Sequence, residues 1–218
     1  MSNLYAMTRS MEAVRRLFKI THAGDCAPQP AIVPDMLAPI VRIRDGEREL
    51  VRARWGFPPA PKTNLPITNI RNLSTEYWKQ WISPQNRCLV PVTSFSEYAP
   101  KPDPETGRKD IVWFAIDDSR PLFAFAGLWR PWSGPRGTKD GRIDGDHELF
   151  GFLTTEANDV VRPVHRRAMP VILHERDWDT WLTAEPGPAL RLQRPWTGAL
   201  DIVARSAEKM DSAIPQGD

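Results

Sequence analysis

The second residue of the chain, Ser2, is the first position that could take part in chemistry. A methionine before a small residue is a start that is usually trimmed, and trimming would expose the α-amine of Ser2. Such an amine titrates at about pH 7.7–8.0, so part of it is unprotonated and nucleophilic at neutral pH. A hydroxyl on the adjacent carbon can assist its reaction, as in enzymes with an N-terminal nucleophile. Ser2 is therefore either a disposable end or a nucleophile.

Three other segments, TNIRN, SFSEY and VHRRAMP, place polar residues beside apolar strand sequence. Glu97 ends an apolar run, and partial burial there would suit it to proton transfer. His165 can shuttle a proton near neutral pH, and Asn69 can donate and accept hydrogen bonds that orient a reactive group. Arg71 shares a face with Asn69 if that segment is extended, and its guanidinium can bind a phosphate. These four side chains would suit one site if the fold brings them together.

Each of these residues also has a plainer interpretation. A glutamate at a strand end, such as Glu97, is more often solvated or ion-paired, and a single histidine is more often a surface residue. Arg167 can be ordinary surface charge. Trp55, next to Arg54 in RWGF, can belong to the core or can stack on a base. Taken singly, these residues predict only a domain with a basic cleft.

The composition narrows the class of protein. With 218 residues and 41% apolar side chains, the chain suits one domain. Its 22 prolines favour short elements joined by stiff loops over a helical bundle. A net charge of +2 implies no particular partner, and Cys26 and Cys88 form neither a metal spacing nor a disulfide framework. Without a signal peptide or a membrane-spanning apolar run, we expect a cytoplasmic protein.

The elements that would position these residues are mostly short strands. Residues 10–19 predict a helix capped by Ser10. Asp45-Gly46 between two β-like runs predicts a hairpin, whereas residues 21–35 read as a proline-rich loop. Further strands are expected at RCLVPVTSFSEY, IVWFAID, PLFAFAGLW, ELFGFLTT, AMPVILH and ALDIVAR. The pattern predicts one α+β domain of mostly antiparallel strands over residues 1–205 and a disordered tail over residues 206–218.

Seven segments occur in the order and approximate spacing of one family: NLYAMT, ARWGF, TNIRN, RCLVPVTSFSEY, FAGLW, FLTTEAN and HRRAMPVIL. On these segments the chain resembles the SRAP family, the SOS response-associated peptidases or abasic-site processing proteins. The resemblance runs from the first residues to about Arg205. It implies a single domain with a strongly bent, barrel-like, mostly antiparallel β-core, short flanking helices and a basic cleft for single-stranded DNA.

The resemblance also implies an activity in the DNA damage (SOS) response. Family members remove their own initiator methionine and expose an N-terminal cysteine. Its amine forms an imine with the ring-opened aldehyde of an abasic site, and its thiol closes the imine into a stable thiazolidine ring. The covalent link shields the lesion from strand cleavage. We therefore expect single-stranded DNA with abasic sites as the partner, a monomer, no cofactor, metal or membrane, and association with the nucleoid when DNA is bound.

By motif position, the resemblance implies a role for each candidate residue. Asn69 would hold the N-terminus and the opened sugar, Glu97 would relay protons, and His165 would stabilise the intermediate and assist reversal. The residues that would contact DNA are Arg54, Trp55, Arg71 and Arg167.

The chain departs from the family at Ser2, where the family has cysteine. A serine keeps the amine, so an imine can form, but we expect Ser2 to weaken or abolish the stable link. An imine that is not captured could promote β-elimination, which would be a weak lyase activity. Ser2 is either an engineered replacement, the natural residue of a member without a durable link, or the natural residue of a member that uses a transient imine. Two other functions stay open: a non-covalent module for single-stranded DNA and a peptidase that acts on other proteins.

Overall fold

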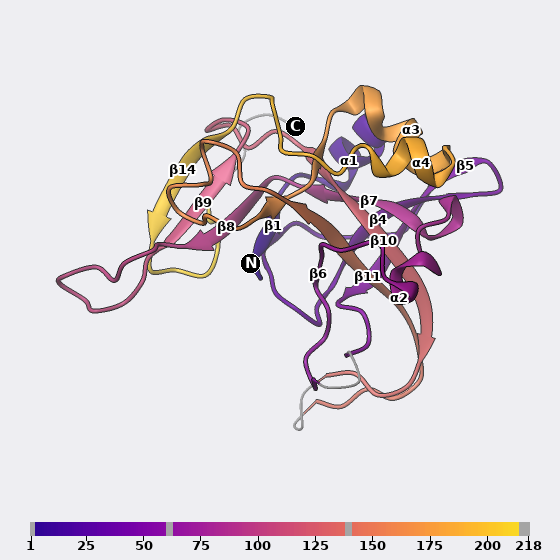
Figure 1. Cartoon of the computed structure of the whole chain (residues 1–218), viewed down its shortest axis with the longest axis horizontal. Coiled ribbons are helices and arrows are strands. Elements are labelled where there is room, and N and C mark those ends of the chain that lie inside the picture. The colour runs from indigo at the N-terminus through magenta and orange to yellow at the C-terminus, as the bar shows by residue number, and fades with distance from the viewer. Residues whose placement is uncertain (1–2, 60–62, 138–140, 214–218) are drawn as a thin grey trace.

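The computed structural model describes residues 3–59, 63–137 and 141–213, and five of its strands close into a barrel (Figure 1). These strands are β4 (Leu37–Arg44), β5 (Glu47–Trp55), β7 (Arg87–Val92), β10 (Phe123–Ser133) and β11 (Asp146–Thr155). An odd number of strands cannot alternate in direction around a closed ring, so one neighbouring pair must be parallel. That pair is β5 with β11, in which Arg54 lies opposite Leu149 and Trp55 opposite Phe150.

A second sheet packs beside the barrel in the order β14-β9-β8-β1-β3. Its members are β1 (Tyr5–Met7), β3 (Gln29–Ile32), β8 (Ser94–Tyr98), β9 (Ile111–Ala115) and β14 (Asp201–Ser206). The chain passes from β7 in the barrel to β8 in this sheet through Thr93, whose N–H and hydroxyl both donate to the Ala6 carbonyl. The Thr93 hydroxyl also accepts a hydrogen bond from the Thr8 N–H at 3.1 Å. These contacts bind β1 to the point where the two sheets meet.

Short elements complete the fold. Two-residue strands pair with the strands of the barrel: β2 (His22–Ala23) with β5, β6 (Asn69–Ile70) and β12 (Met169–Pro170) with β11, and β13 (Ile172–Leu173) with β10. The helices are α1 (Met11–Phe18), α2 (Glu76–Lys79), α3 (Trp178–Thr183) and α4 (Pro186–Leu190), with 3-10 turns η1 (Pro84–Asn86) and η2 (Glu175–Asp177). The α+β class and the bent, barrel-like, mostly antiparallel core expected from the sequence are confirmed.

Local signals in the sequence are confirmed at two places and wrong at a third. The Ser10 hydroxyl accepts a hydrogen bond from the Ala13 N–H at 3.1 Å and caps α1, as predicted. Asp45 and Gly46 have φ values of 53° and 82°, which is the backbone that a two-residue hairpin turn requires. The prediction of a loop over residues 21–35 is wrong, because β2 and β3 lie within it.

Aromatic rings fill the space between the barrel and the second sheet. The Tyr5 ring of β1 has no exposed surface, and its centroid lies 5.1 Å from that of Trp55 and 6.0 Å from that of Phe152, edge-on to both. Burial raises the pKa of the Tyr5 phenol well above its usual value. Because Tyr5 is held in this way, the direction in which the preceding residues leave β1 is set by the core.

Both cysteines lie in the core, and burial raises the pKa of the Cys26 and Cys88 thiols. The thiolate is the reactive form, so we expect neither to react with an aromatic disulfide reagent in the native protein and both to react after unfolding in urea. The absorbance of the released aromatic thiolate measures this directly. Rapid modification of either cysteine in the folded protein would contradict their placement.

The end of the domain is held more tightly than its composition suggests. The sequence predicts disorder over residues 206–218, of which the structure describes residues 206–213. Ser206 ends β14, and the Asp211 side chain is only 3% exposed. No helix among the described residues has the length and apolar character needed to cross a bilayer.

Candidate active site

The pairing of β1 with β8 leads the start of the chain to Glu97. Tyr5 lies opposite Phe95 and Ala6 opposite Ser94, in antiparallel register. The ladder continues past β1, because the N–H and hydroxyl of Ser96 both donate to the Leu4 carbonyl, at 3.1 and 3.2 Å. The next residue towards the beginning of the chain, Asn3, therefore comes level with Glu97. Ser2 itself, the predicted nucleophile, lies outside the described residues.

A cavity of about 290 Å³ opens at this point. Glu97 lies in its wall and is 5% exposed, so its carboxyl group is largely removed from solvent. The other lining residues are Asn3, Leu4, Val33, Pro34, Ser96, Tyr98, Ile111 and Lys209. A buried carboxyl group beside the beginning of the chain can exchange protons with a group that enters the cavity.

Asn69 reaches the same place from the barrel. The last residues of β5 pair with β11 at Leu149 and Phe150, and β6 then takes over the same edge, with Asn69 opposite Phe152. Thr68 and Asn69 both donate to the side-chain oxygen of Asn3, at 3.2 and 3.5 Å, and Asn69 also donates to the Thr68 hydroxyl at 3.0 Å. The barrel edge thereby holds the first described residue of the chain.

Sequence reasoning missed two of these residues, Asn3 and Thr68. Thr68 stands beside the predicted site residue Asn69 in TNIRN, and Asn3 stands beside Ser2, so both are polar neighbours of predicted site residues. Their mutual hydrogen bond joins positions 65 residues apart, and no local pattern carries that information.

His165 approaches from the segment that follows β11. Its ring Nδ1 lies 2.9 Å from the Ala168 carbonyl oxygen, which can only accept, so Nδ1 carries the hydrogen. In the neutral ring, Nε2 is then the nitrogen that can accept a proton. After this turn, β12 pairs with β11 at Thr154 and Thr155, directly beyond the residues that β6 pairs with. The segments that carry Asn69 and His165 are thus attached to successive residues of one strand.

Two residues predicted to contact DNA, Arg71 and Arg167, have exposed side chains near the same end of β11. The backbone at Arg71 is fixed by Gln193, whose side-chain amide donates to the Arg71 carbonyl at 2.8 Å and to the Thr154 carbonyl at 3.0 Å. Arg167 precedes β12 by two residues, and Met169 of β12 lies opposite Thr155. Both guanidinium groups can therefore meet an anion at this end of the barrel.

The expectation that Trp55 borders a DNA base needs correction, because the structure buries this side chain completely. Its ring packs on Phe152 at a centroid distance of 5.2 Å, and its Nε1–H donates to the Thr68 carbonyl at 3.1 Å. Alternation along β5 turns Trp55 into the barrel and Arg54 outward. Arg54 is partly exposed and donates from Nη1 to the Asp35 carbonyl at 2.5 Å. Trp55 supports the site from within the core by holding Thr68.

These features define a class: an α+β barrel with a side sheet that leads the beginning of the chain into a cavity beside a buried carboxyl group. The chain belongs to the SRAP family, because the family model described as "SOS response associated peptidase (SRAP)" matches residues 1–208. The resemblance stated from the sequence is therefore confirmed.

Two curated relatives agree with this assignment. The abasic site processing protein YoqW of Bacillus subtilis is 31% identical over 149 residues, which cover 64% of this chain and 60% of that protein. The abasic site processing protein YoaM of the same organism is 32% identical over 168 residues, covering 71% and 67%. The chain thus spans about three fifths of YoqW's length.

In fold, the chain is similar to a crystal structure from Bordetella bronchiseptica, with a TM-score of 0.70 and 22% identity, covering 95% of this chain and all of that one. A structure from Bacteroides thetaiotaomicron gives a TM-score of 0.68 at 21% identity, with 90% of each chain covered. These two likenesses concern the fold alone.

Proposed function

We propose that this protein processes abasic sites in single-stranded DNA through the α-amine of residue 2, within the DNA damage response. The observation that carries the proposal is the course of the chain's beginning: β1 pairs with β8 so that Asn3 lines the same cavity as Glu97 and is held by Thr68 and Asn69. The names of the relatives YoqW and YoaM support abasic DNA as the substrate.

The chemistry begins with loss of Met1, which the protein would remove itself. The free amine of Ser2 adds to the aldehyde of the ring-opened abasic sugar and gives a carbinolamine. Loss of water from the carbinolamine gives an imine. Glu97 takes the proton that the amine loses and returns a proton to the departing hydroxyl, while Asn69 orients the N-terminal segment. His165 accepts or donates at Nε2 and assists reversal.

The side chain of residue 2 decides what happens to the imine. A cysteine thiol can add to the imine carbon and close a thiazolidine ring, which resists hydrolysis. The serine hydroxyl is a much weaker nucleophile at neutral pH, since its alkoxide is scarcely populated. The Ser2 protein is therefore expected to hold abasic DNA through an imine that reverses or leads to β-elimination and strand cleavage.

The test compares the Ser2 protein with Ser2→Cys on a single-stranded oligonucleotide that carries one abasic site. We expect Ser2→Cys to give a covalent band on a denaturing gel without further treatment. The Ser2 protein should give such a band only when borohydride is present to reduce the imine to a stable amine. The same oligonucleotide without the abasic site is the control, and an intact mass shows whether Met1 has been removed. Absence of a covalent band from both proteins would overturn the proposal.

A second function, non-covalent binding of single-stranded DNA, is favoured by the exposed Arg71 and Arg167 near the end of β11. Such a module would bind abasic and intact strands alike, with an affinity that falls as salt rises because phosphate contacts release counterions. It predicts no covalent band with borohydride, so the same gel separates the two functions.

A further inference from the structure

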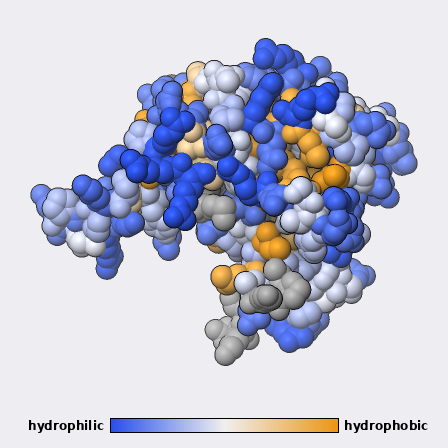
Figure 2. Space-filling model, viewed as in Figure 1, coloured by the Kyte–Doolittle hydropathy of each residue, from blue (hydrophilic) through white to orange (hydrophobic). Residues whose placement is uncertain are grey.

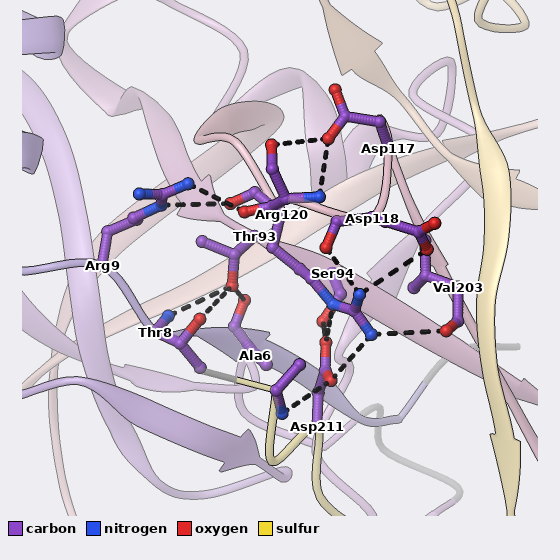
Figure 3. Close-up of polar contacts among 12 residues, drawn as sticks. Ala6, Thr8, Arg9, Thr93, Ser94, Asp117, Asp118, Arg120, Val203 and Asp211 are labelled. Atoms are coloured by element: carbon purple, nitrogen blue, oxygen red, sulfur yellow. Dashed lines mark hydrogen bonds and ion pairs between the residues drawn. The ribbon is translucent and has the colours of Figure 1, made fainter. Parts of the chain in front are cut away.

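The segment that follows β14 is folded back onto the second sheet by a buried ionic cluster (Figure 3). Asp211 Oδ2 accepts from the Ser94 hydroxyl at 2.5 Å and from Arg120 Nε at 3.3 Å, and Oδ1 accepts from Arg120 Nη2 at 3.4 Å. The Asp211 N–H donates to the Pro30 carbonyl at 2.9 Å. Residue 211 is thereby held between β3, β8 and the turn before β10.

This anchor sets the position of Lys209, two residues earlier in the chain. Lys209 lines the cavity that contains Asn3 and Glu97. It also lines a second hollow of about 510 Å³ together with Arg108 and Lys109. Tyr98, which is 54% exposed, lines both hollows, so the two adjoin at this side chain.

Arg108 and Lys109 belong to a well-formed turn rather than to a loose loop. The carboxylate of Asp103 accepts from the N–H groups of Glu105 and Thr106, and the Asp103 N–H donates to the Arg108 carbonyl at 2.8 Å. This turn lies in the arm that projects between β8 and β9 (Figure 1), and the face of the arm seen in Figure 2 is largely hydrophilic.

The three cations of the second hollow are exposed, and within the described part of the chain none of them forms an ion pair. Cations that are close together and unpaired by carboxylates repel one another, and a polyanion that binds between them relieves this repulsion. Because these cations lie beside the Glu97 cavity, the polyanion that fits best is a single DNA strand with one nucleotide in that cavity.

We propose that Lys209, Arg108 and Lys109 form a phosphate-binding track for the part of a single DNA strand that leaves the Glu97 cavity, and that the Asp211 anchor holds Lys209 in this track. The inference rests on the proposed function and adds a binding surface to it. The C-terminal segment is then a wall of the site rather than a trailing end.

The test measures the affinity of the full-length protein for a fluorescent oligothymidylate over a range of salt concentrations. Lys209→Gln should weaken binding about two- to fivefold, and Arg108→Gln/Lys109→Gln about five- to twentyfold, as exposed charge contacts are each worth little. Each lost phosphate contact should also flatten the slope of log K against log salt by about 0.7. Arg16→Gln and Arg15→Gln/Arg16→Gln remove exposed cations from α1, which lines neither hollow, and serve as matched controls.

A variant of the anchor tests the role of Asp211. Asp211→Asn keeps the size of the side chain but loses its charge and one of the two oxygens that accept from Ser94 and Arg120, and should weaken DNA binding as Lys209→Gln does in protein whose circular dichroism is unchanged. If both track variants bind and respond to salt like their α1 controls while Ser2→Cys still captures abasic DNA, the track is overturned and the proposed function stands. If the unaltered protein binds no single-stranded DNA and captures no abasic site, both fail.

Discussion

Glu97→Gln is expected to slow the capture of an abasic site by about 10²- to 10⁴-fold in the Ser2→Cys protein, the range typical of a lost general acid–base group. Glu97 is 5% exposed and lies in the wall of the cavity that Asn3 also lines. Glutamine has the same shape and can still form hydrogen bonds, but it cannot take a proton from the amine or return one to the departing hydroxyl. The loss should therefore fall on the rate of the reaction.

A single-turnover time course of the covalent band measures this rate with protein in excess over abasic oligonucleotide. Affinity for the intact oligonucleotide, measured in parallel, should change little, which separates a defect in proton transfer from one in binding. Glu12→Gln, on the exposed side of α1, is the matched carboxylate control and should keep the full rate. A Glu97→Gln protein that captures abasic DNA at the full rate would exclude Glu97 from proton transfer.

Much of the candidate site could be predicted because its residues stand beside strong strand signals. Glu97 lies in the strand predicted at RCLVPVTSFSEY, which forms β7 and β8, and the hairpin turn at Asp45-Gly46 follows from backbone preference alone. Asn69 lies in the two-residue strand β6, for which the sequence predicts no strand. The position of Trp55 also follows from alternation along β5, since Arg54 points outward and the next residue must point inward. The expectation of a DNA contact at Trp55 came from the family resemblance, and this alternation speaks against it.

Long-range pairing could not be predicted in the same way. The strand β3 was hidden in a proline-rich stretch because its partner β1 is a three-residue strand at the start of the chain. The parallel contact between β5 and β11 follows from closing an odd-numbered ring, and only the complete set of strands reveals it. In each of these pairings, the local sequence of one strand carries no information about which strand is its partner.

The buried cluster at Asp211 is the sharpest case of this kind and leads to the second large effect. We expect Asp211→Ala to lower the free energy of unfolding by about 3 kcal/mol, at the low end of the range for breaking a buried pair. The loss would leave the Arg120 guanidinium, itself 7% exposed, without its buried carboxylate. Arg120 would keep its hydrogen bonds to the Asp118 and Val203 carbonyls, which limits the penalty.

The double variant Arg120→Met/Asp211→Leu distinguishes an uncompensated charge from a general loss of packing. Removing both charges and filling the space with apolar side chains should lower the free energy of unfolding less than Asp211→Ala alone does. The reason is that the double variant leaves no buried guanidinium without its carboxylate. Midpoints of urea unfolding, compared at unchanged slope, measure the stability of the unaltered protein and of each variant. Asp118→Ala, whose carboxylate is exposed and 3.9 Å from Arg120, should change stability by less than about 0.5 kcal/mol. If Asp211→Ala is as stable as Asp118→Ala, the cluster does not hold the C-terminal segment, and the wall it gives the Glu97 cavity must be held by other contacts.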